Sequence, residues 1–186
     1  MKNIVIFASG SGTNAETICK YFENHSKIKV CGIFTNKDLA GVIEVAKKYN
    51  ISHFVFDKKV WNDNFLISNY LDIKIDLIVL AGFLWKVPES FINNHCRIIN
   101  IHPSLLPKFG GRGMYGIKVH ESVKNSGDSE TGITIHEVNS NYDEGNILFQ
   151  SKCNLTSEDD VESIRKKVQV LEHLHLPKFI ESLLSK

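Results

Sequence analysis

The chain has 186 residues, of which 42% are hydrophobic and 23% charged, and its formal net charge is +1. This length and composition predict one compact soluble domain, expected in the cytoplasm, with little left for a second domain. The near-neutral charge argues against nucleic acid as the main partner. The opening apolar run, from Ile4 to Ala8, is too short for a signal-peptide core or a membrane span.

The first half of the chain alternates between short apolar runs and helical patterns. Such alternation predicts parallel strands joined by right-handed helical crossovers, with helices on both faces of the sheet. The expected strands are Lys2–Ala8, Lys29–Thr35, His53–Phe56, Asp76–Ala81 and Arg97–Ile101. The expected helices are Asn14–Glu23, Leu39–Tyr49, Asn62–Leu71 and Pro88–Asn93.

The second half changes character after a helix expected at Met114–Asn125. Gly132–Val138 alternates like a half-exposed strand, and Asn146–Asn154 follows as its neighbour after a turn. This spacing predicts an antiparallel extension of a mostly parallel sheet. A long helix closes the sequence, and we expect Thr156 or Ser157 to cap its start. Its predicted apolar stripe is Val161, Ile164, Val168 and Leu171.

A glycine-rich loop, Ser9–Asn14, lies between the first strand and the first helix. Its glycines permit a tight turn, and the free amides at a helix start favour an anion such as phosphate. A plain strand-to-helix turn has the same pattern. Gly10, Gly12 and Ala15 also satisfy the spacing of a dinucleotide fold, which needs an acid at the end of the second strand. Residues 35–37 are Thr-Asn-Lys, so a phosphate monoester on a smaller ligand fits better.

Asn100 and His102 lie at the end of a predicted strand. Being two apart, they face the same side of an extended segment. An amide can stabilise a developing oxyanion, and an imidazole can transfer protons near neutral pH. A histidine at a strand end can equally be structural.

Asp143 lies in the turn that follows the strand carrying His136. A carboxylate close to His102 would favour the imidazolium and raise the histidine pKa. An acid in a turn can equally face solvent. Only the fold decides whether Asp143 reaches His102.

The cysteine and histidine spacings predict no metal site. No two of the four cysteines form a Cys-x-x-Cys pair, and scattered thiols in an intracellular chain are usually buried and reduced. His173 and His175 lie two apart in a predicted helix, so they face different ways. We assign four further histidines to the surface or to packing: His25, His53, His95 and His120.

Together these segments resemble the folate-dependent formyltransferase family, and within it the phosphoribosylglycinamide formyltransferases. The matching motifs keep their order and spacing over nearly the whole chain. They are Ser9–Asn14, Ala81-Gly82-Phe83, Asn100–Pro107, His136 with Asp143-Glu144-Gly145, and Gln169 with Glu172-His173. The string Asn-Ile-His-Pro-Ser-Leu-Leu-Pro is the most specific of them.

The resemblance implies a single α/β formyltransferase domain over residues 1–186. Its first part, 1–101, would be a Rossmann-like phosphate-binding half, and 102–186 a folate-binding and catalytic half. The implied reaction moves the formyl group of 10-formyltetrahydrofolate, a co-substrate, to 5'-phosphoribosylglycinamide in purine biosynthesis. The formyl group is already activated on nitrogen, so no metal is expected. Neither a nucleic-acid nor a membrane partner is expected, and the implied assembly is a monomer or weak homodimer.

The resemblance also assigns roles by position. Asn100, His102 and Asp143 form the catalytic group, in which a protonated His102 and Asn100 stabilise the oxyanion. The acceptor's phosphate falls to Gly12, Thr13 and Asn14, and its ribose end to Glu172. The implied folate contacts are Leu84, Trp85, Lys86, Val87, Asn100, Asn139, Ser140, Asn141, Tyr142 and Asp143, with backbone groups of 84–87 reading the pterin edge.

Three features depart from the family pattern. Asn62 lies where relatives often have an arginine that contacts folate, and Lys86 replaces other residues in the pterin segment. The loop Phe109–Tyr115 is rich in glycine and differs from the histidine-bearing loop of some relatives. Arg112 in this loop is either a contact to phosphate or carboxylate or a solvent-facing side chain.

Three rival functions share parts of this pattern. Methionyl-tRNA formyltransferases resemble a longer protein with a basic carboxyl-terminal domain. Formyltetrahydrofolate hydrolases usually carry an amino-terminal regulatory domain, whereas here the glycine loop begins at residue 9. A non-catalytic phosphate-binding module would need the glycine loop, but it would have no use for Asn100, His102 and Asp143 together.

Overall fold

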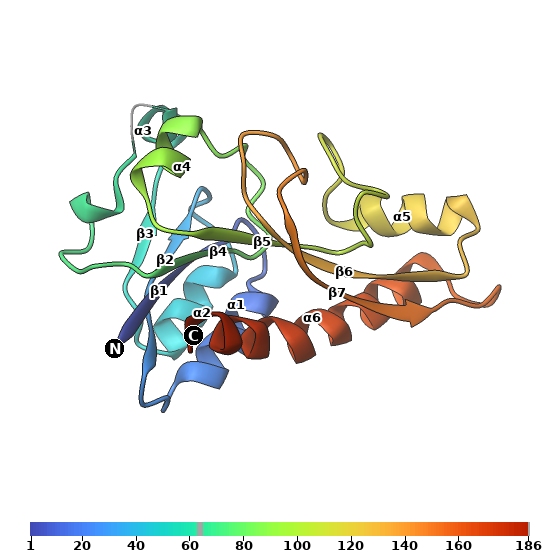
Figure 1. Cartoon of the computed structure of the whole chain (residues 1–186), viewed down its shortest axis with the longest axis horizontal. Coiled ribbons are helices and arrows are strands. Elements are labelled where there is room, and N and C mark those ends of the chain that lie inside the picture. Colours follow the sequence, from blue (N-terminus) through green and yellow to red (C-terminus); the bar gives the residue numbers. More distant parts are fainter. Residues whose placement is uncertain (63–64, 186) are drawn as a thin grey trace.

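A computed structural model describes residues 1–62 and 65–185 of the chain. Within them one sheet of seven strands has the order β3-β2-β1-β4-β5-β6-β7 (Figure 1). The strands are β1 Lys2–Phe7, β2 Ile28–Thr35, β3 His53–Val55, β4 Leu77–Leu80, β5 Ile98–His102, β6 Glu130–Glu137 and β7 Ile147–Asn154. The helices are α1 Thr13–Phe22, α2 Val42–Lys48, α3 Lys58–Asn62, α4 Glu89–Asn94, α5 Ile117–Ser126 and α6 Val161–Leu184.

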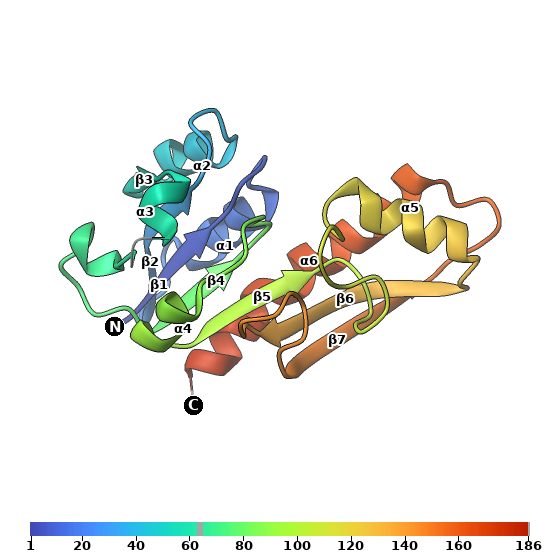
Figure 2. The same cartoon turned by 90° about the horizontal axis from the view of Figure 1, so that it is seen from above.

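The sheet is parallel from β3 to β5 and antiparallel from β5 to β7 (Figure 2). This confirms the predicted parallel half with an antiparallel extension. Because β1, β4 and β5 run the same way, their carboxyl ends meet at one edge of the sheet. Open parallel sheets bind ligands at that edge.

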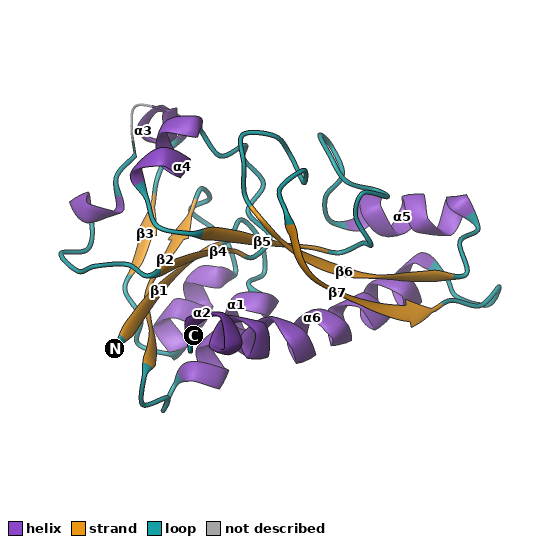
Figure 3. Cartoon of the chain, viewed as in Figure 1, coloured by secondary structure: helices purple, strands orange, loops and turns teal. Residues whose placement is uncertain are grey.

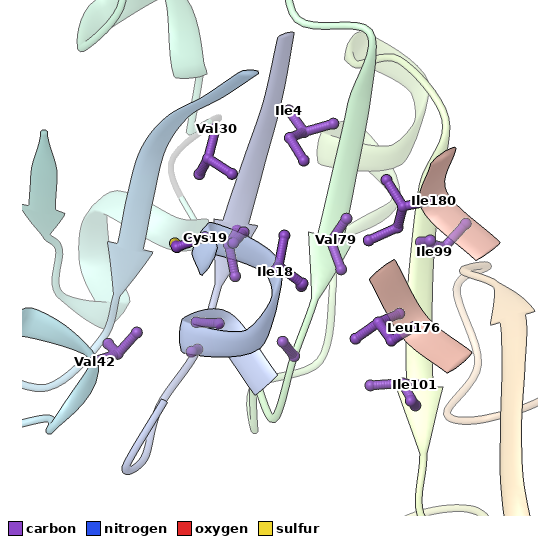
Figure 4. Packing of buried hydrophobic residues seen from close by; sticks show 14 of the residues in the cluster. Ile4, Ile18, Cys19, Val30, Val42, Val79, Ile99, Ile101, Leu176 and Ile180 are labelled. Carbon is purple, nitrogen blue, oxygen red and sulfur yellow. The ribbon is translucent and has the colours of Figure 1, made fainter. Parts of the chain in front are cut away.

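The two faces of the sheet bury different kinds of side chain. Ile4 and Ile6 of β1 face an aliphatic core built with α1, α2 and α6 (Figure 4). Val5 and Phe7 face the opposite side, where aromatic side chains such as Trp61 gather. Burying one such side chain contributes about 1.5–3 kcal/mol to the free energy of folding. The packing on both faces therefore stabilises the sheet. The described residues contain no helix of the length and apolarity that a membrane span requires.

The predicted helix over Asn62–Leu71 is wrong in its described part. The helix α3 ends at Asn62, and only a short 3-10 turn follows at Ile67–Asn69; residues 63–64 lie outside the described part of the chain. Phe65 is buried and stacks on Tyr70 with ring centroids 5.2 Å apart. Aromatic packing therefore overrides the local helical pattern.

The helix expected from Met114 begins later, at Ile117. Gly113 and Gly116 have φ values of +90° and +57°, which a right-handed helix cannot accommodate. The whole segment between β5 and α5 is consequently loop (Figure 3).

The long helix α6 is capped by Asp160 instead of Thr156 or Ser157. The Asp160 carboxylate accepts a hydrogen bond from the Ser163 amide at 2.7 Å. Thr156 starts a separate turn, in which its amide donates to Asp159 at 2.8 Å. The side chains that α6 buries are Ile164, Val168, Leu176, Pro177 and Ile180.

Candidate active site

A cavity of about 530 Å³ opens where the carboxyl ends of β1, β4 and β5 meet. The glycine loop, the end of β5 and the loop before α5 form much of its wall. The turn after β6 and one face of α6 complete it. Segments from both halves of the sequence thus line one site, as a ligand pocket at the edge of an open sheet requires.

The glycine loop brings the start of α1 to the cavity. Gly12 has a φ of +81°, and a Cβ atom there would lie 2.7 Å from the Cα atom of Val42. Glycine is therefore required both by the turn and by the packing of α2. No side chain caps α1 among the described residues, and Ser11, Thr13 and Asn14 line the cavity beside its first amides.

Asn100 and His102 both line the cavity from β5, on the side expected from their spacing. Asn100 lies opposite His136 of β6, and its amide donates to His136 Nε2 at 3.0 Å. The Nδ1 of His136 lies 2.8 Å from the carbonyl of Glu137. A carbonyl only accepts, so Nδ1 carries the proton and Nε2 is free to accept. This interaction fixes the Asn100 side chain and leaves it one further N–H to donate.

His102 is 4% exposed, and its Nε2 donates to the carbonyl of Phe109 at 2.8 Å. Its Nδ1 lies 3.5 Å from the Asp143 carboxylate. Burial lowers the pKa of His102, and it outweighs the Asp143 carboxylate and the Phe109 carbonyl, which raise the pKa. Burial therefore opposes the expected imidazolium and favours the neutral form of His102.

Asp143 does reach His102, so the turn places the acid inside the molecule. Its φ of +57° is a left-handed conformation in which aspartate is enriched. Burial raises its pKa, but the His136 ring, the positive charge that His102 carries when protonated and the Gly111 amide together hold the pKa below its usual value. The Gly111 amide donates to this carboxylate at 2.9 Å. Asp143 is therefore ionised beside a neutral histidine.

The opposite end of the cavity is formed by α1 and α6. Gln169 of α6 donates to the Thr13 hydroxyl at 3.3 Å, which holds the two helices in register. Burial raises the pKa of Glu172 to about 7, against the opposing effects of Asn14 and Arg165. Within the described part of the chain, the Asn14 Oδ1 atom is buried without a hydrogen-bond partner.

Residues 2–180 match the model of the formyl transferase family. The chain belongs to this family. A chloroplastic phosphoribosylglycinamide formyltransferase of Arabidopsis thaliana is 39% identical over 92% of the chain and 62% of the relative. The phosphoribosylglycinamide formyltransferase of Haemophilus influenzae is 35% identical over 97% of the chain and 86% of the relative. The chain thus spans about three fifths of the length of the plant relative.

Solved structures agree with this family assignment. The phosphoribosylglycinamide formyltransferase of Bacillus halodurans superposes with a TM-score of 0.87 at 35% identity, covering 100% of the chain and 96% of that structure. A glycinamide ribonucleotide transformylase of Geobacillus kaustophilus gives a TM-score of 0.88 at 29% identity, covering 99% of each. The single mixed sheet is therefore the formyl transferase fold.

The predicted folate segment of this formyl transferase meets the cavity only in part. Leu84, Tyr142 and Asp143 line it, whereas Trp85, Lys86, Val87, Asn139, Ser140 and Asn141 do not. The Lys86 carbonyl accepts from the Trp61 indole at 2.9 Å, and the Leu84 amide donates to Ser9 at 3.1 Å. These two backbone groups are therefore already paired within the protein.

Further residues line the cavity besides those that the resemblance assigned to the substrates. His120, assigned to the surface or to packing, is 5% exposed and lines the cavity from α5. Arg165 and Gln169 line it from α6, and Arg112 lines it from the loop Phe109–Tyr115. The spacing of Arg165, Gln169 and Glu172 places them on one helical face, a signal available in the sequence. No group of three or more His, Cys, Asp or Glu side chains that could hold a metal occurs among the described residues.

Proposed function

We propose that this chain transfers the formyl group of 10-formyltetrahydrofolate to the amine of 5'-phosphoribosylglycinamide. One observation carries the proposal: Asn100, His102 and Asp143 line the same cavity as the uncapped start of α1 and Glu172. One end of the cavity offers an amide donor and a proton-transfer pair, and the other offers groups suited to a phosphate. A phosphorylated amine can bind its phosphate at one end of the cavity and react through its amine at the other.

The acceptor amine attacks the formyl carbon, and a new carbon–nitrogen bond forms as the carbonyl oxygen becomes an oxyanion. The free N–H of Asn100 stabilises this oxyanion. The Nδ1 atom of the neutral His102, which carries no proton, accepts the proton that the attacking nitrogen loses, and Asp143, 3.5 Å from Nδ1, stabilises the imidazolium. The oxyanion then collapses to a carbonyl as the bond to the folate nitrogen breaks, and the His102 imidazolium returns its proton to that nitrogen.

The remaining groups position the two substrates. The amides at the start of α1, with Thr13 and Asn14, hold the phosphate, because a helix start favours an anion. Glu172 accepts hydrogen bonds from the ribose hydroxyls. The folate lies against Leu84 and Tyr142, close to Asn100.

The test is a folate absorbance assay with purified protein and 10-formyltetrahydrofolate, run with and without phosphoribosylglycinamide. Deformylation that requires the ribonucleotide is the expected result. Deformylation without an acceptor would identify a hydrolase instead. Deformylation only with initiator methionyl-tRNA would identify the other transferase, and absence of turnover with every acceptor would leave a phosphate-binding module.

A further inference from the structure

A cationic side chain, that of Arg165, lies on the face of α6 that lines the cavity together with residues of the glycine loop Ser9–Asn14. Arg165 precedes Gln169 by four residues and Glu172 by seven, so the three share one helical face. Gln169 already contacts Thr13, and all three residues line the cavity. Arg165 and Arg112 are the only lysine or arginine residues in the described cavity wall.

Glu162 holds the Arg165 guanidinium in a fixed orientation. The Arg165 Nε and Nη2 atoms donate to the two carboxylate oxygens of Glu162 at 2.8 and 2.7 Å. A guanidinium has five N–H donors, so this bidentate pair leaves three for another partner. Arg112, in contrast, is exposed on a glycine-rich loop. Arg165 is therefore the less exposed of the two cations, and it has an ion-pair partner.

His120 presents a second free polar group to the same cavity. It is 5% exposed, and its Nδ1 atom has no hydrogen-bond partner in the described part of the chain. Buried polar atoms in folded proteins are nearly always paired, whereas this nitrogen is shielded from solvent and unpaired among the described residues. Burial and, after it, the positive charge of Arg165 lower the pKa of His120 to about 4. The ring is therefore neutral without ligand and able to donate one N–H.

We propose that Arg165 and His120 bind the phosphate of the acceptor from the side opposite the start of α1. The proposal rests on the proposed function and adds two contacts to it. The glycine loop supplies amides and hydroxyls but no full positive charge. A phosphate monoester carries nearly two negative charges, and the planar guanidinium fork is well matched to its oxygens.

The decisive experiment compares two acceptors, phosphoribosylglycinamide and its dephosphorylated nucleoside, in the formyl-transfer assay. Arg165→Gln should raise the KM for the phosphorylated acceptor about tenfold to a hundredfold, the loss expected for one charge-assisted contact. Its kcat, and its kcat/KM with the nucleoside, should match wild type. His120→Gln should show the same selectivity with a smaller effect, and Arg165→Lys should restore part of the affinity.

Lys166→Gln is the matched control, because Lys166 lies 3.8 Å from the same Glu162 carboxylate but does not line the cavity. The proposal would be overturned if Arg165→Gln lost the same fraction of its activity with both acceptors, or if its KM for phosphoribosylglycinamide were unchanged. The proposed function would stand in either case. Failure of the wild-type protein to formylate phosphoribosylglycinamide would instead refute the proposed function. Calorimetry with inorganic phosphate then tests the contact. Weaker or absent binding by Arg165→Gln supports it, whereas binding equal to wild type, or absence of binding by the wild-type protein, overturns it.

Discussion

The two ends of the cavity differ in how their polar groups are satisfied. At the catalytic end, Asn100 contacts His136, His102 donates to Phe109, and Asp143 accepts from Gly111. At the acceptor end, atoms of Asn14 and His120 are buried without partners among the described residues. The polar groups of the proposed catalytic end are thus paired within the protein, whereas the proposed acceptor end keeps two unpaired atoms in the described part of the chain.

Burial disfavours the charged form of a titratable group at both ends of the cavity, but the resulting pKa shifts have opposite directions for a base and an acid. It favours the neutral form of every titratable group, so it lowers the pKa of His102 and raises that of Glu172. At the catalytic end a neutral imidazole is ready to accept a proton. At the acceptor end a less ionised Glu172 repels an incoming phosphate less than a full carboxylate would.

The largest expected effect is a fall in kcat with little change in the KM for the acceptor. His102→Ala and Asn100→Ala should each lower kcat by at least about a hundredfold, as expected for acid–base and oxyanion groups. The KM for the acceptor should change little, because neither residue contacts its phosphate. His53→Ala, at an exposed position of β3, is the control. A nearly unchanged kcat in either variant would remove that residue from the mechanism.

The next effect concerns stability at the acceptor end. The pKa of Glu172 is raised from 4.5 to about 7, so the folded state keeps a proton between these values that the unfolded state has lost. The free energy of unfolding therefore falls as pH rises from about 4.5 through 7, by about 3 kcal/mol at about 1.4 kcal/mol per pKa unit. Glu172→Gln should lose this dependence and be the more stable protein at pH 8.

Denaturant unfolding at pH 5 and pH 8 measures this effect. Glu121→Gln, at an exposed position of α5, is the control and should follow wild type. His120 titrates in both proteins, so its effect cancels in the difference between wild type and Glu172→Gln. If that difference is the same at both pH values, Glu172 does not titrate as described.

The smallest effect tests the idea that the ligand completes the acceptor end. Asn14→Ala removes an unpaired buried oxygen together with the side-chain hydrogen bond to Glu172, and since these two losses have opposite effects, the unfolding temperature of the free protein should change little. Acceptor binding should weaken about tenfold, the loss of one hydrogen bond to a ligand. Calorimetry and thermal unfolding provide the two readouts, with Asn93→Ala on α4 as a control. If Asn14→Ala destabilised the free protein and left its affinity for the acceptor unchanged, the proposed difference between the two ends of the cavity would be wrong.

The sequence by itself determined most of the strands and helices in their order along the chain, and the mixed character of the sheet. Alternating apolar runs predict strands because burial on a sheet has a two-residue period. The parallel arrangement then places Asn100 and His102 at the ligand-binding edge. Where local pattern and packing conflict, as in the wrong helix at Asn62–Leu71, the aromatic contacts of Phe65 and Tyr70 decide.

Only the tertiary structure decided which distant groups meet and how burial changes them. His136 faces Asn100 because β5 and β6 pair in one register, and no spacing along the chain encodes that pairing. The neutral state of His102 depends on desolvation by many residues, which outweighs the one carboxylate that sequence reasoning considered. His120 likewise has no local signal: its place in the cavity follows from the packing of α5 against α6.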